Sequence, residues 1–214
     1  MSFIKTTWFK CIACLLSIAV ISGASLSILN NVLAVSPEMR TARAIKKIYG
    51  EEKEYSVVLD IDSNDDTKNA PIEYDGVGKI NKIYNITDNG DILFQTTGYK
   101  GYKNGTITLW IQVSVYYAEP YGNPQDDDFG CEGYSIEKIV LQSTEKQTLM
   151  SKLTGEFYGG FKLTDVTEAY NNGELFTATE KTAENYNPVS GATYSATAAA
   201  NAVNCVIKYL GGER

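Results

Sequence analysis

The segment from Ser190 to Ser195, Ser-Gly-Ala-Thr-Tyr-Ser, places hydroxyl side chains and a glycine directly before an alanine-rich stretch that ends at Leu210. The alanine-rich stretch predicts a helix, so Thr193 and Ser195 would lie where it begins and could cap its free amides. Gly191 would let the backbone approach a ligand closely, and a helix start offers unpaired N–H donors. The segment is a candidate phosphate site, although an ordinary turn with a helix cap has the same pattern.

The pattern Ser-Gly-Ala-Thr-x-Ser resembles the flavinylation motif of the FMN-binding domain family, which includes FMN-carrying subunits of the Rnf electron-transport complex and of the sodium-translocating NADH:quinone oxidoreductase. In that family a flavin transferase joins the phosphate of FMN to the threonine after Gly-Ala, which is Thr193 here. The resemblance implies an electron-transfer flavoprotein, in which the flavin supplies the redox chemistry and the protein supplies position and electrostatics. It also implies that four neighbours shape the phosphate pocket: Ser190, Gly191, Ala192 and Ser195.

Two stretches depart from the family pattern. The family usually has a loop of the form His-x-Glu-Thr-Pro-Gly-Leu-Gly beside the flavin, and the comparable residues here are 143–150. Glu145 and Leu149 keep their places, whereas Ser143 replaces the histidine and Lys-Gln-Thr replaces Thr-Pro-Gly. Three residues before the serine of the motif, the family has an aspartate and this chain has Asn187. These differences keep open an alternative, a surface-anchored, non-enzymatic binding module that has kept the fold and lost the flavin.

Other chemistry has weaker support. Ser190 could be a nucleophile on a turn, but the chain has no histidine to act as its base and no Gly-x-Ser-x-Gly elbow. The run that starts at Asp60 opens like a calcium loop, but Asp65 and Pro71 stand where such a loop needs a glycine and a bidentate glutamate. The acidic run at 126–128 predicts a solvated loop.

The charge of the chain argues against a nucleic-acid partner. Its 214 residues include 19 Lys and Arg against 26 Asp and Glu, a net charge of −7. Lys5 and Lys10 both lie in an N-terminal stretch without acidic residues, so the remainder is more acidic still. No basic stripe offsets this charge, and such a surface repels a phosphate backbone.

An apolar stretch from Cys11 to about Val35 follows Lys5 and Lys10 and predicts one transmembrane helix. Its first part, 11–21, is also as long as the apolar region of a signal peptide, so a cleaved signal and a retained anchor both remain open. The family resemblance implies a retained anchor and a soluble domain outside the cytoplasm. It further implies FMN as the cofactor, and a flavin transferase and membrane electron-transport subunits or a quinone as partners.

The four cysteines form two pairs in the sequence. Cys11 and Cys14 stand at the start of the apolar stretch, where packing is a better interpretation than a redox or metal role. Cys131 and Cys205 lie in the soluble part and could form a disulfide outside the cytoplasm, although the sequence does not give the distance between them.

Hydrophobic periodicity predicts an α+β fold: a mostly antiparallel sheet with a few packed helices, preceded by one N-terminal transmembrane helix. We divide the chain into an anchor or signal segment at 1–35, a connecting helix and first strand at 36–71, and an FMN-binding domain at 72–214. Strands are expected at 55–61, 72–77, 80–86, 92–96, 106–117 and 135–142, with hairpin turns at 89–90 and 104–105. Helices are expected at 36–50, 149–157 and 197–210.

Overall fold

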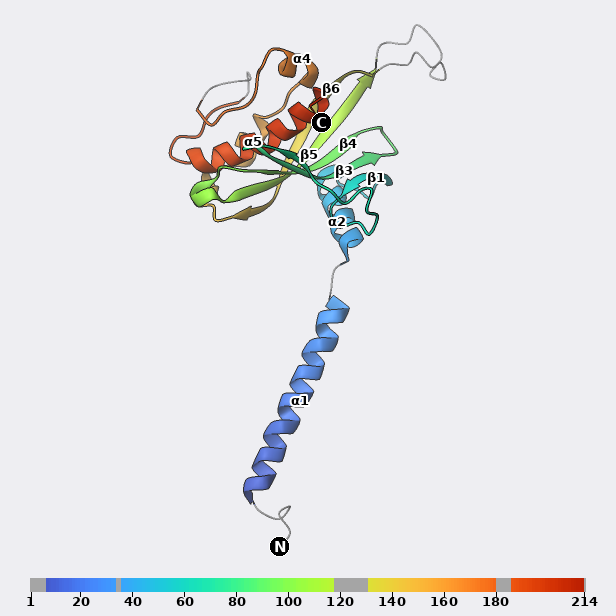
Figure 1. Cartoon of the computed structure of the whole chain (residues 1–214), viewed down its shortest axis with the longest axis vertical. Coiled ribbons are helices and arrows are strands. Elements are labelled where there is room, and N and C mark those ends of the chain that lie inside the picture. Colours follow the sequence, from blue (N-terminus) through green and yellow to red (C-terminus); the bar gives the residue numbers. More distant parts are fainter. Residues whose placement is uncertain (1–6, 34–35, 118–130, 180–185, 214) are drawn as a thin grey trace. The chain divides into compact units, whose positions relative to one another are not determined.

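The computed structural model describes residues 7–33, 36–117, 131–179 and 186–213 (Figure 1). The chain divides into two compact units, residues 1–41 and 42–214. Helix α1 (Thr7–Leu33) belongs to the first unit, and helix α2 (Pro37–Tyr49), which confirms the helix expected at 36–50, extends from the first unit into the second. Within the described ranges, no helix has the combined length and apolar character that crossing a membrane requires.

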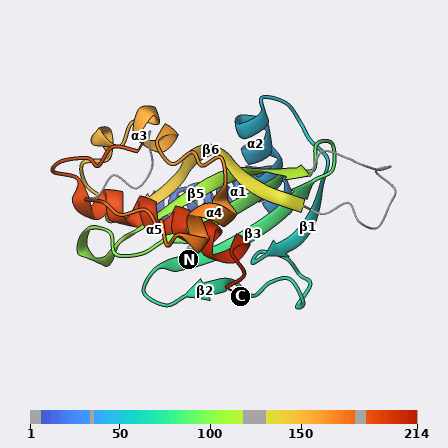
Figure 2. The same ribbon diagram turned by 90° about the horizontal axis from the view of Figure 1, so that it is seen from above.

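The second unit contains an antiparallel sheet of six strands, which confirms the α+β class. The strand order is β1-β3-β4-β5-β6, and β2 pairs with β3 next to the part of β3 that pairs with β1 (Figure 2). All six expected strands are present: β1 Tyr55–Asp60, β2 Ile72–Tyr74, β3 Gly78–Ile86, β4 Ile92–Gly98, β5 Thr106–Tyr117 and β6 Cys131–Glu145.

Helix α5 (Thr193–Leu210) crosses one face of this sheet and contacts β3, β4 and β5 (Figure 1). A Cβ atom on Gly98 of β4 would lie 1.9 Å from the carbonyl oxygen of Ala198 and 2.5 Å from the amide nitrogen of Ala202. The absence of a side chain at Gly98 and the small alanines of α5 therefore let the helix and the sheet meet at backbone distance.

Buried aromatic rings support the segment that leads into α5. Phe157, Phe161, Phe176 and Tyr186 contact one another at ring-centroid distances of 4.8 to 5.9 Å. Tyr186 also donates a hydrogen bond to the carbonyl oxygen of Thr177 at 2.8 Å. Because ring pairs of this kind add packing energy to the burial of large apolar area, Tyr186 is firmly held four residues before Ser190.

The opposite face of the sheet has a smaller apolar cluster. Ile45 and Ile48 of α2 pack against Tyr84, Leu93 and Trp110, whose side chains alternate along their strands with those that face α5. Alternate side chains of each strand thus pack into two separate cores, one on each face of the sheet.

Two helix expectations need correction. The helix expected at 149–157 is wrong: the chain forms a 3-10 turn, η3 (Met150–Lys152), and then a short helix, α3 (Gly155–Gly159). Leu149 is 52% exposed and has φ of +60°, so the apolar spacing that suggested one helix does not face one core. The last helix begins at Thr193, four residues before its expected start, and α4 (Val166–Asn171) was not expected at all.

The acidic run after β1 pairs with a lysine. The Nζ atom of Lys82 lies 2.8 Å from a carboxylate oxygen of Asp60 and 2.6 Å from one of Asp62. Burial raises the pKa of Asp60, but hydrogen bonds from Lys82, Tyr84 and the Asp62 amide, together with the charge of Lys82, bring that pKa below its ordinary value. The carboxylates of Asp60 and Asp62 are therefore paired with a lysine of the protein itself. The other acidic run that was expected to form a solvated loop, 126–128, lies outside the described ranges.

The disulfide that the sequence left open is not formed. Cys205 on α5 is a free, buried thiol, and burial raises its pKa to about 12. A thiol in this state is poorly nucleophilic, so Cys205 acts as a small core residue.

Candidate functional site at the start of helix α5

The predicted site residues lie in one turn that leads into α5. Gly191 has φ of +77°, a conformation that L side chains rarely adopt, and Ala192 is the residue that precedes the first helical position. Ser190 and Thr193 are exposed, whereas Ala192 and Ser195 are buried. The turn therefore presents the hydroxyl of Thr193 to solvent.

The expectation that Thr193 and Ser195 cap the helix amides is wrong. Within the described residues, no side chain caps this end of α5, and Thr193 itself occupies the first helical position. Ser195 is 2% exposed, and its hydroxyl donates instead to Gln147 Oε1 at 2.8 Å or to the Thr148 carbonyl oxygen at 3.1 Å. The first amides of the helix keep their donor capacity for a ligand.

A cavity of about 200 Å³ opens beside Thr193. Three segments line it: the 3-10 turn η2 (Tyr102–Asn104), the loop after β6, and the start of α5. The rings of Tyr102 and Tyr194 lie edge to face with centroids 6.3 Å apart, and Tyr194 is 65% exposed. The lining residues are Tyr102, Thr148, Leu149, Gly191, Ala192, Thr193, Tyr194 and Ser195.

A second cavity, of about 360 Å³, lies next to the preceding residues of the same turn. Its lining includes Asn187, Ser190 and Lys152, and the Nζ atom of Lys152 donates to the carbonyl oxygen of Ser190 at 3.0 Å. Lys152 is a functional candidate that sequence reasoning missed, because 38 residues separate it from its partner and no local signal links them. It brings a positive charge to a motif that contains no basic residue.

The arrangement fits the phosphate end of FMN. An exposed hydroxyl, uncapped helix amides and a nearby ammonium group are the donors and charge that hold a phosphodiester. The cavity beside Thr193 is smaller than the roughly 300 to 1,000 Å³ of typical cofactor sites, so it would accommodate only part of the group. Thr193 would be the attachment residue, with Lys152 and the amides as the anion partners.

Of the three side chains Tyr194, Met150 and Tyr186, only one lines this cavity. Tyr194 lines it. Tyr186 is fully buried in the aromatic cluster, where burial raises its pKa to about 12, and Met150 packs against the main core.

The loop at 143–150 does lie beside the start of α5. Ser143 is still within β6 and pairs with Thr108, and the carboxylate of Glu145 pairs with Lys146 at 3.2 Å. Gln147 and Thr148 make the contacts to Ser195.

Comparison with known proteins found no matching family model and no similar protein, either among curated proteins or among solved structures.

Proposed function

We propose that this chain is an extracytoplasmic electron-transfer flavoprotein that carries FMN in a phosphoester bond to Thr193. The observation that most supports this proposal is the position of Thr193, an exposed hydroxyl at the uncapped start of α5 beside a cavity. A threonine that only stabilised the helix would be expected to cap it, and Thr193 does not.

Attachment requires an activated flavin phosphate, because joining a phosphate monoester directly to an alcohol would release water. A flavin transferase with a flavin–nucleotide anhydride as donor satisfies this requirement. The Thr193 oxygen attacks the phosphorus on the flavin side, the new O–P bond forms, and the anhydride P–O bond breaks. A nucleoside monophosphate leaves, and the hydroxyl proton passes to a base of the transferase.

The residues of this chain would then act on the bound phosphodiester. The remaining negative charge would be held by the amides of the first helical turn and by Lys152, and no acid–base side chain is needed for electron transfer. A permanent bond suits a domain outside the cytoplasm, where a dissociated cofactor would be lost.

The proposal includes the N-terminal segment as a signal or a membrane anchor. The apolar stretch from Cys11 to Val35 and the preceding Lys5 and Lys10 support export. The domain would exchange electrons with membrane electron-transport subunits or a quinone on the outer side.

Two valine variants of the full chain test the attachment site. Thr193→Val removes the proposed acceptor hydroxyl, and Thr197→Val is a matched control because Thr197 lies one helical turn later and its hydroxyl donates to the Thr193 carbonyl oxygen at 2.8 Å. After co-expression with a flavin transferase, denatured Thr193→Val should show no flavin absorbance, and Thr197→Val should match the wild type. Covalent flavin in Thr193→Val would refute the assignment.

The alternative function is a non-enzymatic, surface-anchored binding module without flavin. Asn187 in place of the family's aspartate and Ser143 in place of its histidine favour it, because both changes remove groups of the resembled pattern. A colourless wild-type chain under conditions that modify a family control protein would support this alternative.

A further inference from the structure

Gln147 joins three separate segments through one side chain. Its Oε1 atom accepts from the Tyr102 amide at 3.2 Å and from the Ser195 hydroxyl at 2.8 Å. Its Nε2 atom donates to the Glu145 carbonyl oxygen at 2.9 Å. The amide of Gln147 thus links η2, the end of β6 and the first turn of α5.

The surrounding backbone leaves just enough room for this side chain. A Cβ atom on Gly101 would lie 2.2 Å from Gln147 Nε2, and one on Gly105 would lie 2.6 Å from the same atom. The two glycines close the β4–β5 connection, with the Gly101 amide donating to the Gly105 carbonyl oxygen at 2.9 Å. Close packing and three hydrogen bonds together fix the orientation of the glutamine amide.

Two of the segments joined by Gln147, η2 and the first turn of α5, line the cavity beside Thr193, and the third part of the lining is Thr148 and Leu149, which directly follow Gln147. We propose that Gln147 is a positioning residue that holds the Thr193 hydroxyl at the mouth of this cavity for flavin attachment, an inference that rests on the proposed function. In the loop pattern of the resembled family this position is a proline. Proline has no side-chain amide, so the three hydrogen bonds of Gln147 are particular to this chain.

Gln147 would act through Ser195. Residues two apart on a helix face different directions, so the inward anchoring of Ser195 leaves Thr193 pointing outward. An uncapped first turn otherwise tends to fray, and fraying would spread the Thr193 hydroxyl over many positions. Tethering Ser195 keeps the turn helical without using the amides that a phosphate needs.

The test compares Gln147→Leu with Gln112→Leu in the full chain. Both variants replace a hydrogen-bonded amide with an apolar side chain of similar size. Gln112 bonds to Asp91 at 2.7 Å and lines neither cavity of the site, so its variant controls for a general loss of stability. The readouts are the single-turnover rate of flavin attachment with saturating flavin transferase and FAD, and hydrogen exchange of the Ala196 amide, which donates to the Ala192 carbonyl oxygen at 2.9 Å and so reports opening of the first turn.

We expect Gln147→Leu to slow attachment by about tenfold or more and to accelerate exchange of the Ala196 amide, whereas Gln112→Leu leaves both unchanged. Gln147→Glu should recover part of the rate, because a carboxylate still accepts from Ser195 and Tyr102. An unchanged rate in Gln147→Leu, with a modified wild type, overturns the positioning role and leaves the proposed function standing. A wild type that is never modified overturns both.

Discussion

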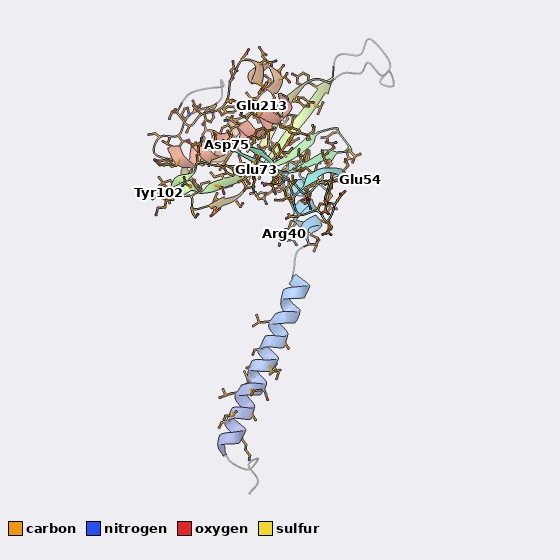
Figure 3. The ribbon with its side chains drawn as sticks, in the orientation of Figure 1. Arg40, Glu54, Glu73, Asp75, Tyr102 and Glu213 are labelled. Carbon is orange, nitrogen blue, oxygen red and sulfur yellow. The ribbon has the colours of Figure 1, made fainter. Side chains whose placement is uncertain are left out.

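The two ends of helix α5 differ in how their backbone groups are hydrogen-bonded. Figure 3 labels Tyr102, near the N-terminal end, and Glu213, near the C-terminal end. At the C-terminal end, the Gly211 amide donates to the Ile207 carbonyl oxygen at 2.9 Å, and Lys208 Nζ lies 3.1 and 2.9 Å from the two carboxylate oxygens of Glu213. Tyr74 adds a hydrogen bond from its hydroxyl to the Glu213 carbonyl oxygen at 2.7 Å.

The N-terminal end has no comparable closure among the described residues. Ala192 offers no capping side chain, Thr193 is exposed, and the tether that exists runs through Ser195 and leaves the first amides free. A helix end without a cap gives up roughly 0.5 to 2 kcal/mol of stability. We infer that this helix is fixed at its C-terminal end and over its length, so that its N-terminal end can bind an anion.

Adding a side chain at the close contact between β4 and the middle of α5 should destabilise the fold, because the helix must move away from the sheet. Gly98→Ala places a Cβ atom 1.9 Å from the Ala198 carbonyl oxygen, and backbone there must move. We expect a loss of about 2 to 3 kcal/mol in the free energy of unfolding, measured by urea denaturation. Gly155→Ala is the matched control, since a Cβ atom there meets nothing within 4 Å, and an equal loss in both variants would contradict the packing explanation.

A hydroxyl deletion at the C-terminal end should affect stability alone. Tyr74→Phe removes the bond to the Glu213 carbonyl oxygen and should cost about 1 kcal/mol in unfolding free energy, with flavin attachment unchanged. Tyr158→Phe removes a buried hydroxyl that has no hydrogen-bond partner among the described residues, so it should be neutral or slightly stabilising. Equal costs for the two variants, or slower attachment in Tyr74→Phe, would argue against separate roles for the two ends.

A weaker effect is a pH dependence at the same end. The hydrogen bond from Lys208 is the largest cause that lowers the pKa of Glu213 below its ordinary value of 4.5. The ionised form therefore stabilises the fold above pH 4.5, and this contribution is lost as the pH falls further through the lowered pKa. Glu213→Gln should flatten that part of the stability profile in acid, and an unchanged profile would show that the ion pair contributes nothing measurable.

Local sequence patterns predicted most of the fold. The strand expected at 106–117 is β5 to the residue, because alternating β-branched and apolar side chains mark it clearly. Helix α5 begins at Thr193, four residues before its expected start at Thr197, in a stretch whose threonine and serine have lower helix propensity than alanine. Ser195 in this stretch is hydrogen-bonded to Gln147, and no local pattern reports a contact between residues 48 positions apart.

The candidate site could be predicted only in part for the same reason. The motif located Thr193 and its turn, since these residues are adjacent in sequence. Lys152, Gln147 and Tyr102 join the site through pairing of β5 with β6 and through the turns that follow, which are properties of the folded sheet.

Covalent attachment of FMN to Thr193 can be measured by the intact mass of the exported chain after co-expression with a flavin transferase, combined with peptide mapping. We expect an FMN-sized increment located on the peptide that contains Thr193. An unmodified mass, under conditions that fully modify a family control protein, would contradict the proposed attachment.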